Sequence, residues 1–291
     1  MQLAICTFST VYDTTPLQDV VTLEELLAGL SRFELKPEVQ REAERDERRI
    51  RAAWEAWATQ GYVAGRWFSA LLREARKVEA AGGDAHREVM ALRDRMISES
   101  RARAKTTFTI WAPALYAPGA RRESDHVLQL SALVLDFDGG IDIGSATSDF
   151  DDWLHVVHTT WSHTPERPKF RLVLPLAAPV LAADWARVWA WADARCGHAA
   201  DPAMKGRGAN FALPVVPHED WPRQGFVHRS ELLDVRALGL VDRVGEHPTT
   251  LQGTAGHPQF HGGDPNKRYA PAPGVRPQGD WDLDAAFEDL F

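Results

Sequence analysis

The chain has 291 residues, of which 44% are hydrophobic, and it carries a formal net charge of −8. This length and apolar content allow one large domain or two small ones, and they exclude a chain too polar to bury a core. Only Cys6 and Cys196 are present, which excludes a disulfide framework and a thiolate metal site. No signal peptide or long apolar span follows Met1, so we expect a cytoplasmic protein that makes no contact with a membrane.

The first 36 residues predict a strand and a short helix. Residues 2–12 are mostly apolar or β-branched and predict a strand. Thr22 has the character of a helix N-cap. Glu24 and Glu25 follow in the first turn, where negative charge is stabilised by the positive end of the helix dipole. We expect this segment to form one domain together with residues 106–244.

Residues 37–105 predict a helical insertion into that domain. Ile50, Trp54 and Trp57 recur at the spacing of one helix face, and two or three antiparallel helices would account for the segment. Residues 40–105 carry 15 Lys or Arg against 11 Asp or Glu, so their outer face fits either a solvated surface or a nucleic-acid groove.

The region from residue 106 to 244 predicts strands interleaved with helices. Asp184 and Gly197 bound a tryptophan-rich segment whose apolar residues fall on one helix face. The predicted strands cover 107–111, 127–137, 153–160, 170–175 and 209–216. Because these elements show no regular βαβ repeat, the sequence predicts an α+β fold around a mixed or antiparallel sheet.

Two carboxylates end the most apolar of these strands, in the run Leu133-Val-Leu-Asp-Phe-Asp-Gly139. Since side chains alternate along a strand, Asp136 and Asp138 share one face and Phe137 lies on the other. Two like charges on one face repel each other unless a cation or proton lies between them, and a hard ion such as Mg²⁺ suits carboxylate oxygens. The plain alternative is a strand that runs into an acidic turn.

Basic and polar residues follow this strand along the chain. Arg167, Lys169 and Arg171 share one face of the strand that begins near residue 170, and the polar turn before them contains Ser162 and His163. A later loop begins at Asp201-Pro202 and contains Lys205 and Arg207. Each feature also has a structural interpretation: a solvated strand face, a loop whose polar groups satisfy the backbone, and a turn acid.

These features together resemble the archaeo-eukaryotic primase superfamily, specifically the primase-polymerases of bacterial plasmids, phages and mobile elements. The resemblance covers roughly residues 106–216 and the first strand. It implies an α+β, RRM-like catalytic core in which Asp136, Asp138 and Asp201 are the catalytic residues and the ligands of two divalent ions, Mg²⁺ or Mn²⁺.

The resemblance also implies residues that bind the nucleotide and the nucleic acid. The nucleotide would contact Ser162, His163, Lys169, Arg171 and Arg207, and the nucleic acid would contact Arg121 and Arg122. The sequence departs from the family pattern at two places: Ser162 and His163 are adjacent where the family has Ser-x-His, and Ala209 stands where relatives often have arginine.

The implied activity is template-dependent nucleotidyl transfer, for primer synthesis or extension during replication of a mobile element. Its partners would be nucleoside triphosphates and a single-stranded or primed DNA template, and the helical insertion could help to grip the template. Two alternatives remain open: a primase-like replication initiator that binds nucleic acid without catalysis, and a haloacid-dehalogenase-type phosphatase with Asp136 as nucleophile.

Residues 245–291 predict a flexible Pro- and Gly-rich linker that ends in an acidic, aromatic tail. Residues 280–291 hold five acids and no base, together with Trp281 and Phe287. Such a segment is too short to fold alone but could place aromatic anchors in a partner's groove. We expect a helicase, sliding clamp or single-strand-binding protein as that partner.

Overall fold

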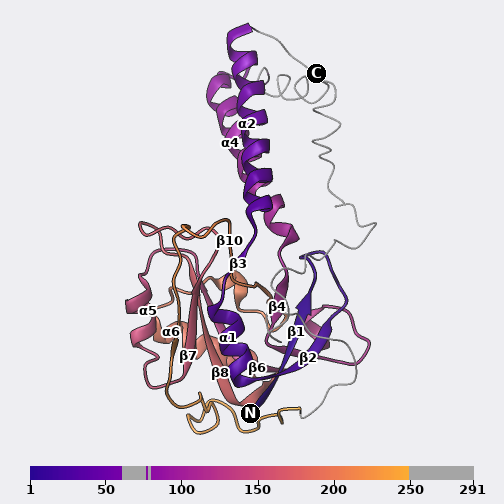
Figure 1. Ribbon diagram of the computed structural model, residues 1–291, viewed down its shortest axis with the longest axis vertical. Helices are drawn as coiled ribbons and strands as arrows, with labels where there is room; N and C mark the ends of the chain where they lie inside the picture. The colour runs from indigo at the N-terminus through magenta and orange to yellow at the C-terminus, as the bar shows by residue number, and fades with distance from the viewer. Residues whose placement is uncertain (61–76, 78–79, 249–291) are drawn as a thin grey trace. The chain divides into compact units, whose positions relative to one another are not determined.

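The computed structural model describes residues 1–60, 77 and 80–248 (Figure 1). The predicted tail lies almost wholly outside these residues, as does part of the predicted helical insertion. The described chain divides into two compact units. The first is Met1–Pro37 with the chain from Phe108 onward, and the second is Glu38–Thr107. No helix among the described residues is long and apolar enough to cross a membrane.

A five-stranded antiparallel sheet is the centre of the first unit. Its strands lie in the order β11 (Gly225–His228), β7 (His155–Thr159), β8 (Phe170–Leu181), β6 (Val127–Phe137) and β5 (Ala114–Tyr116). The strand predicted over 127–137 has the observed bounds of β6. The strand predicted from residue 170 is longer than expected, because the apolar run of β8 continues through Pro175 and pairs with the start of β6 after a register shift.

A second antiparallel sheet lies in the same unit. Its strands are β2 (Leu17–Thr22), β1 (Gln2–Phe8), β4 (Ile110–Ala112) and β9 (Phe211–Ala212), in that order. The strand predicted over 209–216 is in fact two short strands, β9 and β10 (Val215–Val216), because Pro214 has no N–H to continue a ladder. Strand β10 pairs in parallel with β3 (Glu34–Leu35).

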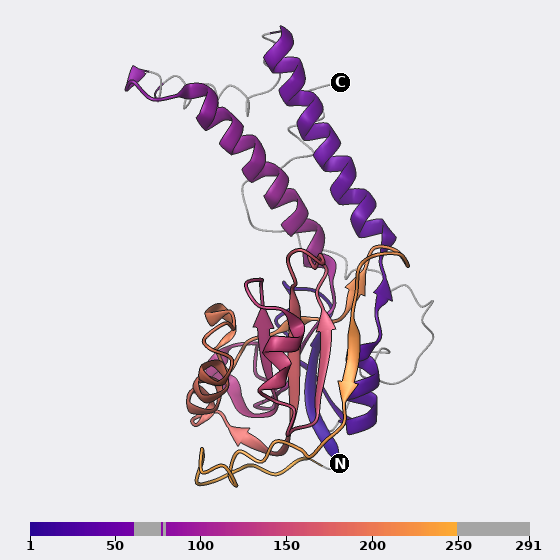
Figure 2. The same cartoon turned by 90° about the vertical axis from the view of Figure 1, so that its left-hand side faces the viewer.

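Helices cover both faces of the five-stranded sheet (Figure 2). The helices are α1 (Leu23–Ser31), α5 (Ile143–Ser148) and α6 (Trp185–Arg195), with short 3₁₀ turns η2 (Ser124–His126) and η3 (Pro202–Met204). Leu135 and Phe137 of β6 pack in the cluster that contains α5 and α6, whereas Val134 packs in the cluster that contains α1. Thr22 and Glu25 form a capping box at the start of α1, which confirms the predicted helix start.

The fold class is therefore α+β with antiparallel sheets, as the sequence predicts. Phe137 is fully buried and faces α5 and α6, so Asp136 and Asp138 point to the other side of the sheet, as strand alternation requires.

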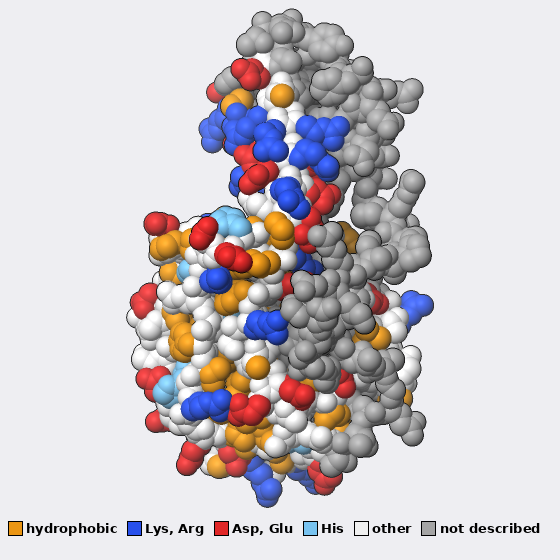
Figure 3. All heavy atoms as spheres, in the orientation of Figure 1, with side chains coloured by type: hydrophobic (Ala, Val, Ile, Leu, Met, Phe, Trp, Pro, Cys, Tyr) orange, Lys and Arg blue, Asp and Glu red, His pale blue; other side chains and the backbone are white. Residues whose placement is uncertain are grey.

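The second unit contains the helices α2 (Pro37–Gln60) and α4 (Ala85–Ala104) and the turn η1 (Lys105–Thr107). Ile50 and Trp54 are buried, as the predicted apolar stripe requires. Acidic and basic side chains are intermixed on the surface of these helices (Figure 3). Arg51 and Arg101 both bond to Glu47, at 2.8 and 2.5 Å, so at least part of the Arg-rich face is a network of ion pairs.

Candidate active site

Three polar side chains form a row across the central strands of the five-stranded sheet. In the antiparallel register, Asp136 of β6 lies opposite Arg171 of β8, and Arg171 lies opposite His158 of β7. Residues opposite each other in a ladder share a face, so the three side chains lie on the same side of the sheet. The row brings the first acid of the predicted metal pair directly against a predicted phosphate-binding base.

Arg171 is held by three contacts. Its Nε donates to Oδ1 of Asp136 at 2.8 Å, and its Nη1 donates to the backbone carbonyl of Ala212 at 2.7 Å. The guanidinium also lies over the ring of Phe211, 5.5 Å from its centroid. Because Phe211 and Ala212 form β9, Arg171 links the two antiparallel sheets at the position of the acidic pair.

Lys169 forms the second ion pair of the site, with Asp138. Its Nζ lies 3.0 Å from Oδ1 of Asp138, whose side chain is 60% exposed, whereas the Asp136 and Arg171 side chains are only 13% and 12% exposed. The Lys169 side chain is only 17% exposed, so just the carboxylate end of this pair lies in water, and the pair is worth about 1 kcal/mol, the upper end for surface ion pairs. The site thus contains one firmly held base and one held by a weaker ion pair.

Asp201 meets the acidic pair through its backbone. Its N–H donates to the carbonyl of Asp136 at 2.8 Å, although 65 residues separate the two in sequence. The Asp201 side chain accepts a hydrogen bond from the N–H of Ala203 at 2.9 Å and so caps η3. Asp201 thus begins a turn beside Asp136, and its role as a metal ligand stays a prediction.

The donor chemistry of these carboxylates suits a hard divalent ion. Oxygen ligands alone favour Mg²⁺ or Mn²⁺, and Oδ2 of both Asp136 and Asp138 makes no hydrogen bond within the described part of the chain. The carboxylates of Asp136, Asp138 and Asp201 do not form a cluster within 4.8 Å; the group of three that meets this distance in the described ranges is elsewhere. Arg171 and Lys169 instead supply the positive charge beside the pair.

His163 positions the backbone that leads to Lys169. The ring is buried, and its Nδ1 accepts a hydrogen bond from the N–H of Lys169 at 3.2 Å. Burial lowers the pKa of His163, which keeps Nδ1 unprotonated and able to accept. Ser162 beside it is half-buried. The predicted polar turn therefore contacts the backbone of Lys169, and His163 holds that backbone in place.

The remaining predicted arginines have partners away from the acidic pair. Arg207 donates from Nε to the carbonyl of Ser124 at 2.7 Å and from Nη2 to Asp125 at 2.5 Å, which ties its loop to η2. Arg122 donates to the carbonyl of Val11 at 2.6 Å and lies over a phenylalanine ring of β1. Arg121 is exposed. Among the described residues, the side chains of Arg171 and Lys169 thus contact the predicted acids, whereas those of Arg207 and Arg122 bond elsewhere.

His158 completes the row as a buried histidine within a strand, the place that its sequence position predicts. Its Nδ1 lies 3.3 Å from the carbonyl of Thr159, and its Nε2 has no hydrogen-bond partner among the described residues. Burial, reinforced by the charge of Arg171, lowers the pKa of His158 to about 3. A neutral ring beneath Arg171 leaves that guanidinium as the sole cation of the row, so Asp136 has one counter-charge there.

Gly139 allows the chain to turn away directly after the acids. Its φ of +114° is one that side chains other than glycine rarely adopt, and a Cβ there would lie 3.2 Å from Nε of Arg167. The third base of the predicted basic face therefore lies against the turn that follows Asp138.

Comparison with known proteins gives one structural likeness. No protein-family model matches the chain, and no curated protein matches it. Among solved structures, the chain is similar to the AEP domain of the Cyanophage S-2L Primase-Polymerase. The two share 12% sequence identity with a TM-score of 0.34, over 50% of this chain and 75% of that one.

Proposed function

We propose that the first unit is a divalent-metal-dependent nucleotidyltransferase of the primase-polymerase type, which uses nucleoside triphosphates on a single-stranded or primed DNA template. The observation that carries the proposal is the register of β6 and β8. It sets Asp136 against Arg171, while the N–H of Asp201 bonds to the carbonyl of Asp136. Acids that suit metal ions and bases that suit phosphates thus lie side by side on β6 and β8, and the backbone of Asp201 lies beside Asp136.

Asp136, Asp138 and Asp201 would hold the two ions, Mg²⁺ or Mn²⁺. Bound ions of this kind lower the pKa of an attacking hydroxyl and offset charge on the leaving pyrophosphate. The bases have a separate task, because a guanidinium or ammonium that donates to a carboxylate oxygen donates equally well to a phosphate oxygen. Lys169 would leave the exposed Asp138 carboxylate and donate to a phosphate oxygen of the nucleotide. Arg171 would keep its hydrogen bond to the carbonyl of Ala212 and donate from an unchanged position.

Primer extension tests the proposal. The full chain would be incubated with a primed single-stranded template, labelled nucleotides and Mg²⁺ or Mn²⁺, and compared with the Asp136→Asn/Asp138→Asn variant. Asp220→Asn/Asp242→Asn is the matched control, because both of its acids are exposed and the change in charge is the same. We expect extension by the wild type and the control and none by the first variant. Equal extension by all three would refute the assigned site.

A second function is favoured by the two ion pairs themselves. Since Arg171 and Lys169 already neutralise Asp136 and Asp138, the same geometry suits a primase-like protein that binds nucleic acid without catalysis. Template binding that survives Asp136→Asn, together with no extension by the wild type under either metal, would establish this function instead.

The phosphatase alternative makes a different demand on Asp136. A nucleophilic carboxylate needs one oxygen free to attack phosphorus; Oδ1 of Asp136 accepts a charge-assisted hydrogen bond from Arg171 at 2.8 Å, which leaves Oδ2 for the attack. An aspartyl-phosphate trapped at Asp136 during hydrolysis of a phosphate ester would place this alternative above the other two.

A further inference from the structure

A second group of metal-binding side chains lies on the opposite face of the five-stranded sheet. Asp151, His155 and His228 each offer one ligand atom, and these atoms lie within 4.8 Å of one another. His155 begins β7 and His228 ends β11, where the two residues are directly opposite in the register. Because His155 and His158 are three positions apart in β7, this group and the row at Asp136 lie on different faces.

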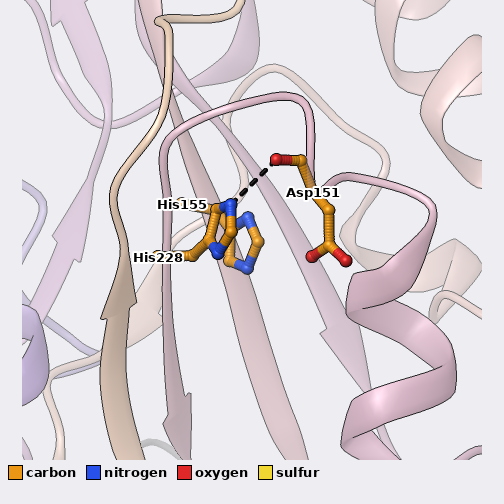
Figure 4. Close-up of side chains that lie close together, drawn as sticks. All are labelled: Asp151, His155 and His228. Carbon is orange, nitrogen blue, oxygen red and sulfur yellow. Dashed lines mark hydrogen bonds between the residues drawn. The ribbon is translucent and has the colours of Figure 1, made fainter.

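Backbone carbonyls fix the proton on each imidazole ring. Nδ1 of His155 lies 3.0 Å from the carbonyl of Trp153, and Nε2 of His228 lies 2.8 Å from the carbonyl of Asp151 (Figure 4). A carbonyl only accepts, so these two nitrogens carry the hydrogens. In the neutral rings, the other nitrogens, Nε2 of His155 and Nδ1 of His228, each present a lone pair.

In the described part of the chain no hydrogen bond is found for Nδ1 of His228 or for the Asp151 carboxylate, whereas His155 has a second backbone hydrogen bond, to Phe150, besides the one to Trp153. The two rings are nearly parallel with centroids 4.8 Å apart, and the Asp151 side chain lies beside them (Figure 4), so one ring must turn about its Cβ–Cγ bond before both in-plane lone pairs reach one ion. His155 is 1% exposed, so its ring is shielded from water.

We propose that Asp151, His155 and His228 form a binding site for a borderline transition-metal ion of the Zn²⁺ class. Two imidazole nitrogens and one carboxylate oxygen are ligands that Zn²⁺ takes together, with water in a fourth position. Hydrogen bonds from the remaining ring N–H groups to backbone carbonyls are the usual way in which proteins orient such histidines. The ligands differ from the oxygen-only set at Asp136, so the two sites select different metals.

The site joins segments that already share hydrogen bonds, among them the Ser230 hydroxyl to the carbonyl of Asp152 and the N–H of Leu154 to the carbonyl of Glu231. His228 belongs to β11, which is an edge strand of four residues, and Asp151 lies in the turn between α5 and β7. A metal ion shared by them fastens the edge strand and the turn to β7. The role assigned to the ion is therefore structural, and it is independent of the proposed nucleotidyl transfer.

The test is binding of Zn²⁺ alone to the full chain after treatment with a chelator, measured by calorimetry, with Co²⁺ absorption as a second signal. His228→Gln keeps an N–H near the Asp151 carbonyl and removes the Nδ1 lone pair, while Asp151→Asn removes only the charge. His198→Gln is the control, because His198 also pairs with an aspartate, Asp193 at 2.9 Å, but lies outside the group. The Asp136→Asn/Asp138→Asn variant separates this binding from any at the acidic pair.

We expect one equivalent of Zn²⁺ to bind to the wild type, to the control and to the Asp136→Asn/Asp138→Asn variant. His228→Gln and Asp151→Asn should each weaken binding by at least about 10-fold. Zn²⁺ at 100 times the wild-type Kd should raise the Tm of the wild type by about 5 °C and that of His228→Gln by no more than about half as much. Unaltered binding by His228→Gln, loss of binding with the acidic pair, or no saturable binding by the wild type would each overturn the proposal.

Discussion

Replacement of Arg171 by methionine shows whether the Asp136 carboxylate needs a cation beside it. The guanidinium donates to Asp136 at 2.8 Å and to the Ala212 carbonyl at 2.7 Å. Methionine keeps similar length and apolar contact with the Phe211 ring but removes every donor. The carboxylate would then remain in a site where only 13% of its side chain is exposed, without a counter-charge.

The expected cost follows from this burial. Removal of one partner from a buried ion pair costs about 3–5 kcal/mol, and the residual exposure of both side chains places this pair at the low end, near 3 kcal/mol. The Asp136→Asn/Arg171→Met variant no longer contains an unpaired charge, so we expect it to recover about 1–2 kcal/mol of that loss. Divalent cations should also stabilise Arg171→Met more than the wild type, because they can take over the role of the guanidinium.

Urea unfolding followed by tryptophan fluorescence measures these differences. Arg236→Met, at an exposed arginine, is the control and should stay within about 0.5 kcal/mol of the wild type. A coupling energy below about 0.5 kcal/mol between Asp136 and Arg171 would refute the ion pair as a major contribution. Equal stabilisation of Arg171→Met and of the double variant by Mg²⁺ would refute Asp136 as a metal ligand.

Two further outcomes test the surroundings of the site. The pKa of His158 falls from an ordinary value of about 6.5 to about 3, so between these pH values the unfolded chain binds a proton that the folded chain does not. The free energy of unfolding should therefore decrease by up to about 1.4 kcal/mol for each unit by which the pH is lowered through this range. His158→Leu should remove this contribution in urea titrations at several pH values. Gly139→Ala should cost about 1–3 kcal/mol in the same assay, because of its φ of +114° and the contact with Arg167, whereas Gly206→Ala has nothing within 4 Å and should cost less than 1 kcal/mol.

The parts of the fold that the sequence predicts are those set by local pattern. Strand β6 has the predicted bounds because its apolar run is continuous, and α1 begins at Thr22 because the capping residues are adjacent in sequence. Strands β2, β5 and β11 are absent from the prediction. Strands β5 and β11 are short, and β11 has two exposed residues followed by two half-buried ones at a sheet edge, so its strand character comes from pairing with β7 rather than from its own composition.

The candidate site likewise has features that local sequence pattern predicts and features that only long-range contacts create. Strand alternation alone predicts that Asp136 and Asp138 share a face, whereas the approach of Asp201 depends on a contact across 65 residues and was implied only by the family resemblance. The bond of Arg207 to Asp125 and the meeting of His155 with His228 are long-range too. Single histidines in separate strands give no spacing signal, and so the sequence holds no pattern that would have revealed the second cluster.

The ion pair at Asp138 gives the site a property that an acidic pair alone would lack. Lys169 can donate to the Asp138 carboxylate or to a phosphate at the same place, so in the absence of metal ions the carboxylate competes with a nucleotide for the ammonium group. Asp138→Asn should therefore abolish primer extension and yet tighten metal-free binding of a nucleoside triphosphate by about twofold to fivefold, the equivalent of a surface ion pair. Lys169→Met should weaken that binding in the wild type, and in the Asp138→Asn background it should cancel the gain. Fluorescence titration with a labelled triphosphate in the presence of a chelator measures all four proteins, and a gain that persists without Lys169 would show that the lysine does not move between carboxylate and phosphate.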